Sequence, residues 1–194
     1  MTEAVKARER TESPVRLLNG INLDVLSTTV KAMRADPELG VSQFRATNRW
    51  LTANHNRTTV TGFHAAKQEI AHEQTFELDA DEPAMLSGRD VAANPVEHLL
   101  HALASCLTTS MVAHAAVRGI AIRTVESEIE GDINLNGYLG LSPDVPRGFT
   151  DLRVTFRVEA DPKYHTRLKE LTEFSPVFNT IKDGARVSVQ VEPK

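Results

Sequence analysis

One segment constrains the fold of this chain more than any other: residues 94–118, which read NPVEHLLHALASCLTTSMVAHAAVR. Asn94 is a favourable N-cap, Pro95 suits the first helical position, and Gly119 is the residue type that usually follows a helix end. Leu, Ala, Val and Met occur almost all round this helix, so it must be buried on most sides. It is about 36 Å long at roughly 1.5 Å per residue, and the other elements have to be arranged around it.

The segments around the helix show strand and helix patterns in turn. Residues 41–65 predict a hairpin and residues 69–79 a third strand, because apolar residues recur there with a period near two. After the helix come two more alternating strands, a second amphipathic helix, a helical turn that opens at Ser175, and a final strand in ARVSVQVE, residues 185–192. The order β-β-β-α-β-β-α-β predicts an α+β fold, mostly antiparallel, with helices packed on one face.

The start of the chain is predicted to lie outside this domain. Residues 1–16 are charged and lack periodicity, so we expect a disordered lead-in. Residues 20–35 suit a short helix that Asn22 can cap. We therefore predict an N-terminal extension with a short helix over residues 1–40 and one α+β domain over residues 41–194.

Composition argues against several functional classes. The chain has 22 Lys and Arg against 26 Asp and Glu, a net charge of −4, whereas a general nucleic-acid binder shows a basic excess. Its single cysteine excludes an intrachain disulfide framework and a Cys-rich zinc site. No continuous apolar run reaches the roughly 18 residues of a membrane span, and the first residues lack the apolar segment of a secretory signal. We expect a cytoplasmic protein without nucleic-acid or membrane partners.

The only thiol, Cys106, lies in the middle of the predicted helix. Small and apolar residues share its helix face, and on that ground alone a buried, inert cysteine is favoured. A reactive thiol needs a lowered pKa, and Cys106 lies eleven residues past Pro95, too far for the positive end of the helix to help. A nucleophilic Cys106 therefore requires a cation from another element.

Three polar residues near the helix start offer other chemistry. His98 and His101 are three residues apart and can chelate a metal, but no third ligand is identifiable, so we expect no metal. Glu97 and His101 are four residues apart, a spacing that favours a simple pair. Glu97 also lies nine residues before Cys106, which places it about 180° round the helix and about 13 Å along it. Cooperation between these two residues would require another element or another subunit.

Three segments of the sequence carry a family resemblance. They are the long helix with its cysteine, the strand VESEIEGDINL after it, and SPVFNTI leading into RVSVQVE. Together they resemble the OsmC/Ohr family of osmotically inducible and organic-hydroperoxide-resistance proteins. The resemblance covers residues 41–192. It implies an intertwined homodimer of α+β subunits, with long central helices between sheets and the sites at the dimer interface. In peroxide-reducing members a helix cysteine, which matches Cys106, attacks the O–O bond and becomes a sulfenic acid, while an Arg and a Glu hold the thiolate.

This chain departs from that family pattern at two positions. The cysteine that resolves the sulfenic acid normally precedes the Pro-Val of the later turn, where this chain has Ser175, so an intrachain two-cysteine cycle is excluded. The family's glutamate is the third residue from the Asn-Pro start, where this chain has Val96, and Glu97 comes one position later. The Arg is expected near the first hairpin turn, where Arg57 is the best positional match and His55 a weaker one; without the resemblance, Arg57 is simply a solvated strand residue.

Three hypotheses about function follow. The first is a one-cysteine thiol peroxidase of organic hydroperoxides: Cys106 is the nucleophile, Arg57 stabilises the thiolate, Glu97 pairs with that Arg across the dimer, and an external thiol is the reductant. The second is a non-catalytic homodimer that binds an apolar small molecule in the interface pocket, and the third is a metal-binding module at the two helix histidines. No cofactor is expected. The residues expected to contact the substrate are Leu99, Leu103, Ser175 and Phe178.

Overall fold

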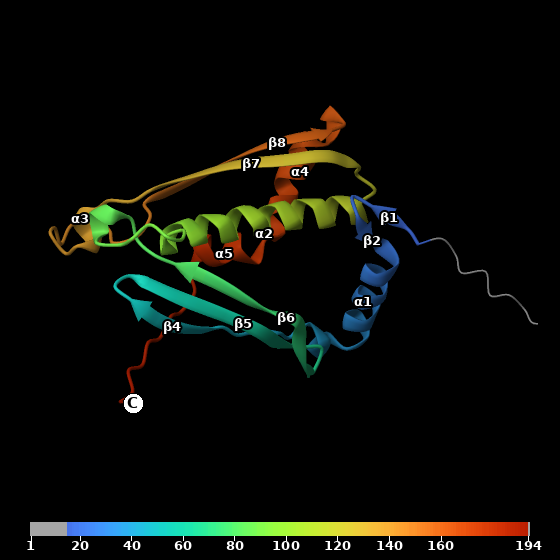
Figure 1. Cartoon of the computed structure of the whole chain (residues 1–194). Helices are drawn as coiled ribbons and strands as arrows, with labels where there is room; N and C mark the ends of the chain where they lie inside the picture. The colour runs from blue at the N-terminus through green and yellow to red at the C-terminus, as the bar shows by residue number, and fades with distance from the viewer. Residues whose placement is uncertain (1–14, 194) are drawn as a thin grey trace, which may run out of the picture.

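The structure is a computed structural model that describes residues 15–193. Its central element is the helix α2 (Pro95–Val117), with one antiparallel sheet on each side (Figure 1). One sheet is the long hairpin of β7 (Ile122–Asp132) and β8 (Asp151–Ala160). In the other, β5 pairs with three strands, so that the sheet contains β3 (Gln43–Phe44), β4 (Thr47–Thr52), β5 (His55–Ala65) and β6 (Gln68–Ala80). The predicted α+β class is confirmed, but the long helix lies between two sheets rather than on one face of a single sheet.

Helix α2 begins and ends where its sequence predicts. Asn94 Oδ1 accepts the backbone N–H of Glu97, and the Glu97 carboxylate accepts the N–H of Asn94, so two otherwise unpaired donors are satisfied reciprocally. Gly119 follows the helix with a φ of +71°, which glycine adopts without strain. Among the described helices, α2 alone is long and apolar enough to cross a bilayer, a property that it shares with the core helices of soluble proteins. Its buried side chains form a stripe: Leu103, Leu107, Met111, Ala115 and Ala116.

The main core lies between α2, the β7–β8 hairpin and the helices that follow β8. α4 (His165–Leu171) lies between two 3-10 turns (Pro162–Tyr164 and Thr172–Phe174), and α5 (Pro176–Asp183) comes next. These helices confirm the predicted amphipathic helix and the helical turn after it. A buried cluster joins the elements, and alternate side chains of β8 pack against it. The cluster consists of Met111, Ala115, Ile120, Leu168 and Leu171.

The register of the β3–β6 sheet separates a charged face from an apolar face. Arg57 lies opposite Asp79, and one position along Thr58 lies opposite Leu78. Because successive residues of a strand point to opposite faces, Arg57 and Asp79 share one face while Leu78 lies on the other. Phe76 shares the face of Leu78, and these two side chains are 42% and 49% exposed. The described chain therefore leaves much of this apolar face uncovered.

The N-terminal extension forms a strap between the two halves of the molecule. It contains a short hairpin of β1 (Leu17–Leu18) and β2 (Ile21–Asn22), the helix α1 (Leu23–Ala35) and a 3-10 turn (Pro37–Gly40). Asn22 caps α1, as predicted. At one end the strap contacts the junction of α2 and β7, and at the other end it reaches the turn between β5 and β6 (Figure 1). The lead-in expected over residues 1–16 falls almost entirely outside the described residues.

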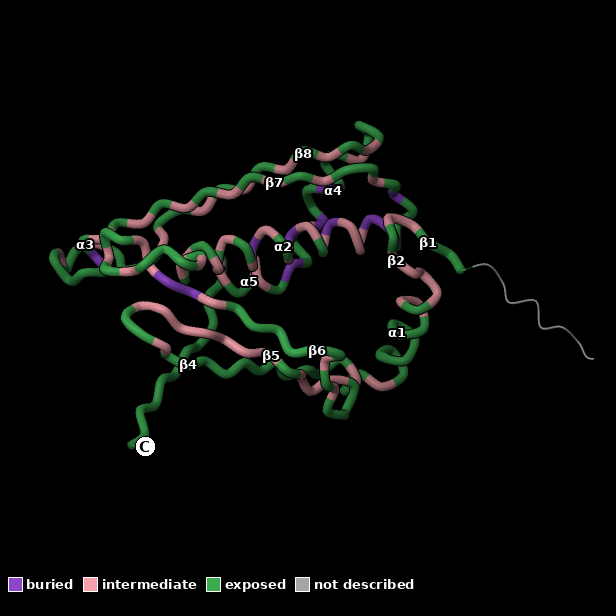
Figure 2. Tube along the Cα trace, viewed as in Figure 1, coloured by how far each residue is buried: buried purple, intermediate pink, exposed green. Residues whose placement is uncertain are grey.

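The prediction of a final strand over residues 185–192 is wrong for this structure. Residues 185–193 pair with no other strand, and Val187, Val189 and Val191 are between 81% and 94% exposed (Figure 2). Their alternation is that of a strand, but a strand exists only when a neighbour accepts and donates its backbone hydrogen bonds. In this structure the described residues provide no such neighbour. The short elements that remain are α3 (Leu135–Tyr138) and a 3-10 turn (Ala84–Leu86).

Candidate functional site

Cys106 is half-buried at the middle of α2, and it forms no disulfide. Its helix neighbours Leu103 and Leu107 are 3% and 4% exposed, so the thiol lies at the edge of the buried stripe rather than within it. It lies about 16 Å along the helix axis from Pro95. No hydrogen bond of Cys106 is found among the described residues.

Glu97 contributes to the end of α2 rather than to the thiol. Its carboxylate accepts the N–H of Asn94 at 2.8 Å, so the expected pair with His101 is replaced by the capping box. The signal for this was present in the sequence, because an Asn followed three residues later by a Glu is the pattern of a capping box. The helix geometry that separates Glu97 from Cys106 is retained, since α2 is continuous between them.

Arg57 is engaged by two carboxylates on the charged face of the β3–β6 sheet. Its Nε donates to Asp79 Oδ1 at 2.5 Å, its Nη2 donates to Asp79 Oδ2 at 2.9 Å, and its Nη1 donates to Glu77 at 3.1 Å. These hydrogen bonds hold the pKa of the Asp79 carboxyl well below its usual range and raise the pKa of Arg57. No bond within the described chain joins Arg57 to Cys106 or Glu97.

Two histidines complete a polar cluster around Asp79. His55 Nε2 lies 3.1 Å from Asp79 Oδ2, and an N–H of Arg89 donates to His55 Nδ1 at 3.3 Å. His98, in the first turn of α2, bonds through Nε2 to the backbone oxygen of Asp79 at 3.0 Å. His98 is therefore a hydrogen-bonding partner that connects α2 to β6. The described residues contain no group of three potential metal ligands, so the metal hypothesis gains no support.

The loop between β6 and α2 is organised by Asp81, which is 1% exposed. Its carboxylate accepts the backbone N–H groups of Glu82, Arg89 and Val91. Burial acts to raise the pKa of Asp81, but these three hydrogen bonds outweigh it and the pKa is lowered. This buried charge, which no motif in the sequence marks, fixes the loop that presents Arg89 to His55.

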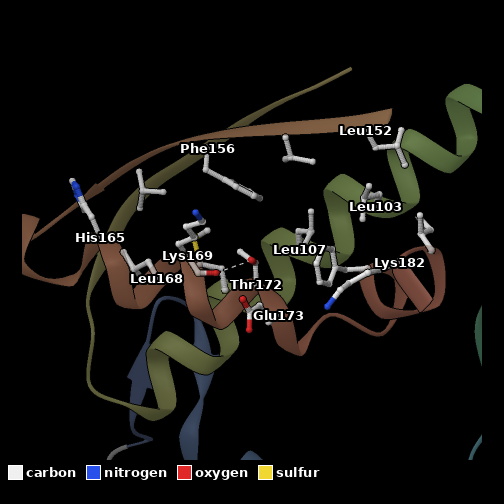
Figure 3. A pocket seen from close by; sticks show the side chains of 15 residues that line it. Leu103, Leu107, Leu152, Phe156, His165, Leu168, Lys169, Thr172, Glu173 and Lys182 are labelled. Carbon is white, nitrogen blue, oxygen red and sulfur yellow. Dashed lines mark hydrogen bonds between the residues drawn. The ribbon is translucent and has the colours of Figure 1, made fainter. Parts of the chain in front are cut away.

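A cavity of about 660 Å³ opens between α2, β8, α4 and α5 (Figure 3). Leu103 and Phe178, two of the four residues expected to contact a substrate, line it. The other two do not: Leu99 is 38% exposed, and Ser175 is fully buried, with its hydroxyl oxygen accepting the N–H of Phe178 as the cap of α5. Cys106 is not among the lining residues, although its neighbour Leu107 is.

Much of the cavity wall was not identified from the sequence. Apolar side chains of α2 and β8 supply its inner surface, and exposed charged residues of α4, α5 and the 3-10 turn between them supply its rim. The alternation of β8 marked its inward side chains as core, but it did not show that a space remains beside them. The missed residues include Met111, Phe156, Lys169 and Lys182.

The comparison with known families decides the family. The model of the OsmC-like protein family matches residues 88–190, which include all of α2 and the β7–β8 hairpin. The chain belongs to the OsmC-like family. The resemblance expected from the long helix and the closing turn is thereby confirmed.

Solved structures show the same fold at low sequence identity. A candidate osmotic stress induced and detoxification response protein from Psychrobacter arcticus is 18% identical, with a TM-score of 0.53 over 70% of this chain and 85% of that one. An OsmC-like protein from Mycoplasma pneumoniae is also 18% identical, with a TM-score of 0.52 over 72% and 87%. An OsmC-like protein of unknown function from Vibrio cholerae is 12% identical, with a TM-score of 0.50 over 72% and 94%. No curated protein matches the chain.

Proposed function

We propose that this OsmC-like protein acts in peroxide stress and reduces organic hydroperoxides through Cys106. The observation that carries the proposal is the position of the thiol. The only cysteine of the chain lies half-buried at the centre of α2, inside the segment that matches the family. A partly exposed thiol can meet a small electrophile, whereas a fully buried one is inert.

The reaction requires one thiol of the protein and two from outside. The Cys106 thiolate attacks one oxygen of the hydroperoxide, the O–O bond breaks, and the alkoxide that leaves takes up a proton to become an alcohol. Cys106 is oxidised to a sulfenic acid. An external thiol then displaces water to give a mixed disulfide, and a second external thiol releases the Cys106 thiolate as an external disulfide. Ser175 cannot replace the external thiol, because a hydroxyl forms no disulfide.

The proposal includes a homodimer in which a second copy completes the site. Two surfaces that the single chain leaves open support it: the apolar face that carries Phe76 and Leu78, and the unpaired valines of residues 185–193. In this arrangement Arg57 of one copy stabilises the thiolate of the other. Arg57 must then give up one of its hydrogen bonds, and the bond to the more exposed Glu77 is the one that yields more readily.

The test is the pH dependence of Cys106 alkylation in the folded protein, followed by mass spectrometry after one equivalent of cumene hydroperoxide. The proposal predicts labelling that is half-maximal well below the unperturbed thiol pKa of about 8.5, and prompt formation of a sulfenic acid. The Arg57→Gln variant should shift the labelling curve to higher pH, and Arg49→Gln, on the neighbouring strand β4, should leave it unchanged. A thiol that stays unlabelled until the protein unfolds would refute the peroxidase proposal.

A second candidate function is the binding of a small molecule without oxidation of Cys106. It is favoured by the cavity, because Cys106 does not line it, and by the two carboxylates that already occupy Arg57. Two measurements distinguish the candidates. A binding protein should take up its ligand equally well in the Cys106→Ser variant and should consume no hydroperoxide.

A further inference from the structure

The cavity beside α2 combines an apolar interior with a cationic rim. Leu107 and Met111 of α2 face Val154 and Phe156 of β8 across it, and none of these side chains offers a hydrogen-bond donor. The ionisable residues that line it are all exposed, so they lie where the cavity meets the solvent (Figure 3). They are His165, Lys169, Glu173 and Lys182.

We propose that this cavity binds a single-chain aliphatic carboxylate, with its chain between α2 and β8 and its carboxylate held by Lys169 and Lys182 at the rim. The inference deepens the binding function given above as the second candidate, and it does not depend on thiol chemistry. The cavity of about 660 Å³ has the size of an ordinary small-molecule site.

The charge of the rim selects an anion. Lys169 and Lys182 form no ion pair in the described structure, and the rim holds a single carboxylate, Glu173. Cations nearby on the same part of the chain are already neutralised, since Lys163 pairs with Asp161 and Arg167 with Glu170. Two ammonium groups against one carboxylate leave a net positive rim, which attracts an anionic headgroup and disfavours a cationic one.

The apolar interior selects the rest of the ligand. A compact polar metabolite would lose its hydration against leucine, valine and phenylalanine without gaining a hydrogen bond, which is unfavourable. A hydrocarbon chain gains by the same burial, and each additional buried methylene should tighten binding by about fourfold. The half-buried Thr172 also lines the cavity, but its hydroxyl already donates to the backbone oxygen of Lys169 at 2.7 Å. A largely apolar interior together with a charged rim therefore fits an amphiphile with one chain and one charged end.

The C-terminal segment of the chain is a less suitable occupant. Residues 185–193 leave α5 and run toward the side of the molecule that carries β4, away from β8 (Figure 1). Residues 185–193 carry Arg186 and Glu192, so their charges cancel and they offer the positive rim no net negative charge. A free carboxylate ligand faces neither obstacle.

The test uses calorimetric titration of the full-length Cys106→Ser protein with octanoate, decanoate and dodecanoate, and with decan-1-ol as the neutral match to decanoate. We expect one site per chain, a Kd that falls with chain length, and decanoate that binds more tightly than decan-1-ol. Exchanging both rim lysines, Lys169→Gln and Lys182→Gln, should weaken decanoate about tenfold or more and leave decan-1-ol unchanged. The control Arg167→Gln, a cation of α4 that does not line the cavity, should bind decanoate as before.

Each other outcome overturns a stated part of the inference. Equal affinity for decanoate and decan-1-ol would show that the two lysines do not bind the carboxylate, although the cavity would still bind a small molecule. Absence of binding by all four compounds would refute the inference, whereas the binding function would still allow a ligand of another class. Tighter decanoate binding in the Val189→Asp variant would mean that the C-terminal segment occupies the cavity in solution. An affinity for decanoate that depends on protein concentration would mean that a second copy of the chain occupies the cavity.

Discussion

Asn19 connects the N-terminal extension to Ile120, which lies between the central helix α2 and β7. Its side-chain amide donates to the backbone oxygen of Ile120 at 3.0 Å, and its Oδ1 accepts the N–H of Ile122 at 2.9 Å. Asn19 adopts a φ of +52°, a conformation that Asn tolerates better than most residues. One side chain thus satisfies both backbone groups at the point where α2 gives way to β7.

Asn19→Ala should therefore lower the free energy of unfolding by about 1–3 kcal/mol, because two partly buried backbone groups lose their partners. The same variant should raise hydrogen exchange at Ile122 and proteolytic cleavage within α1. Asn136→Ala is the control, because Asn136 is exposed and its side chain bonds only to Asn134 among the described residues. Unchanged protection at Ile122 would contradict a role of Asn19 in holding the strap.

The pair of Asp79 and Arg57 should make stability depend on acid pH. The pKa of Asp79 is lowered in the folded state, so the stabilisation is complete above its unfolded pKa of about 3.9 and is lost as the pH falls toward the folded value. The melting temperature of the native protein should therefore exceed that of Asp79→Asn by a constant amount near neutral pH. Below about pH 4 the two should converge, and parallel curves down to pH 2 would contradict the pairing.

Leu171 is fully buried, and Leu171→Ala should destabilise the fold by about 2–5 kcal/mol. Chemical denaturation measures the change. Leu141→Ala removes the same atoms from a side chain that is 70% exposed, and it should cost less than about 0.5 kcal/mol. Similar losses for the two variants would place the core elsewhere than between α2, β7–β8 and α4.

The family resemblance predicts that Ser175 occupies the position of the resolving cysteine, and Ser175→Cys tests that correspondence. Treated with cumene hydroperoxide, this variant should form an intrachain disulfide with Cys106, visible as a cross-linked peptide under non-reducing conditions. A disulfide requires Cα atoms within about 7 Å. Thr180→Cys, also on α5 but exposed, should remain unlinked. Persistence of two separate thiols in Ser175→Cys would show that the two positions do not meet.

The ends of α2 could be predicted because they depend on residues close together in the sequence. Features that depend on pairing between distant residues could not. Asn94, Pro95 and Gly119 determine where the helix starts and stops, because each satisfies or tolerates the backbone geometry of a helix end. The pairing of Arg57 with Asp79 depends on the register between β5 and β6, which is set by residues far from either. A charged strand residue is therefore predicted to be solvated as long as its cross-strand neighbour is not known.

The final strand and the cavity illustrate two other limits. The alternation of residues 185–192 describes a capacity to pair, but the described residues of this structure supply no partner strand. Lys169 and Lys182 look like ordinary solvated helix positions, because the sequence does not show that an apolar space lies beside them. Family membership followed from the long helix and closing turn, whereas the site residues depend on contacts between elements.

The strap limits how the two sheets can move relative to each other. It is fixed by Asn19 at the α2–β7 junction and by Lys67 to Asp36 and Glu38 at the turn between β5 and β6. The β3–β6 sheet is thereby attached to the rest of the molecule at both of its ends, by its own chain through β6 into α2 and by α1 from the opposite direction. The sheet can therefore separate from α2 only if the contacts made by Asn19 or by Lys67 break. A single proteolytic cut in α1 would remove this second attachment and leave the sheet joined to the rest of the molecule through β6 and α2.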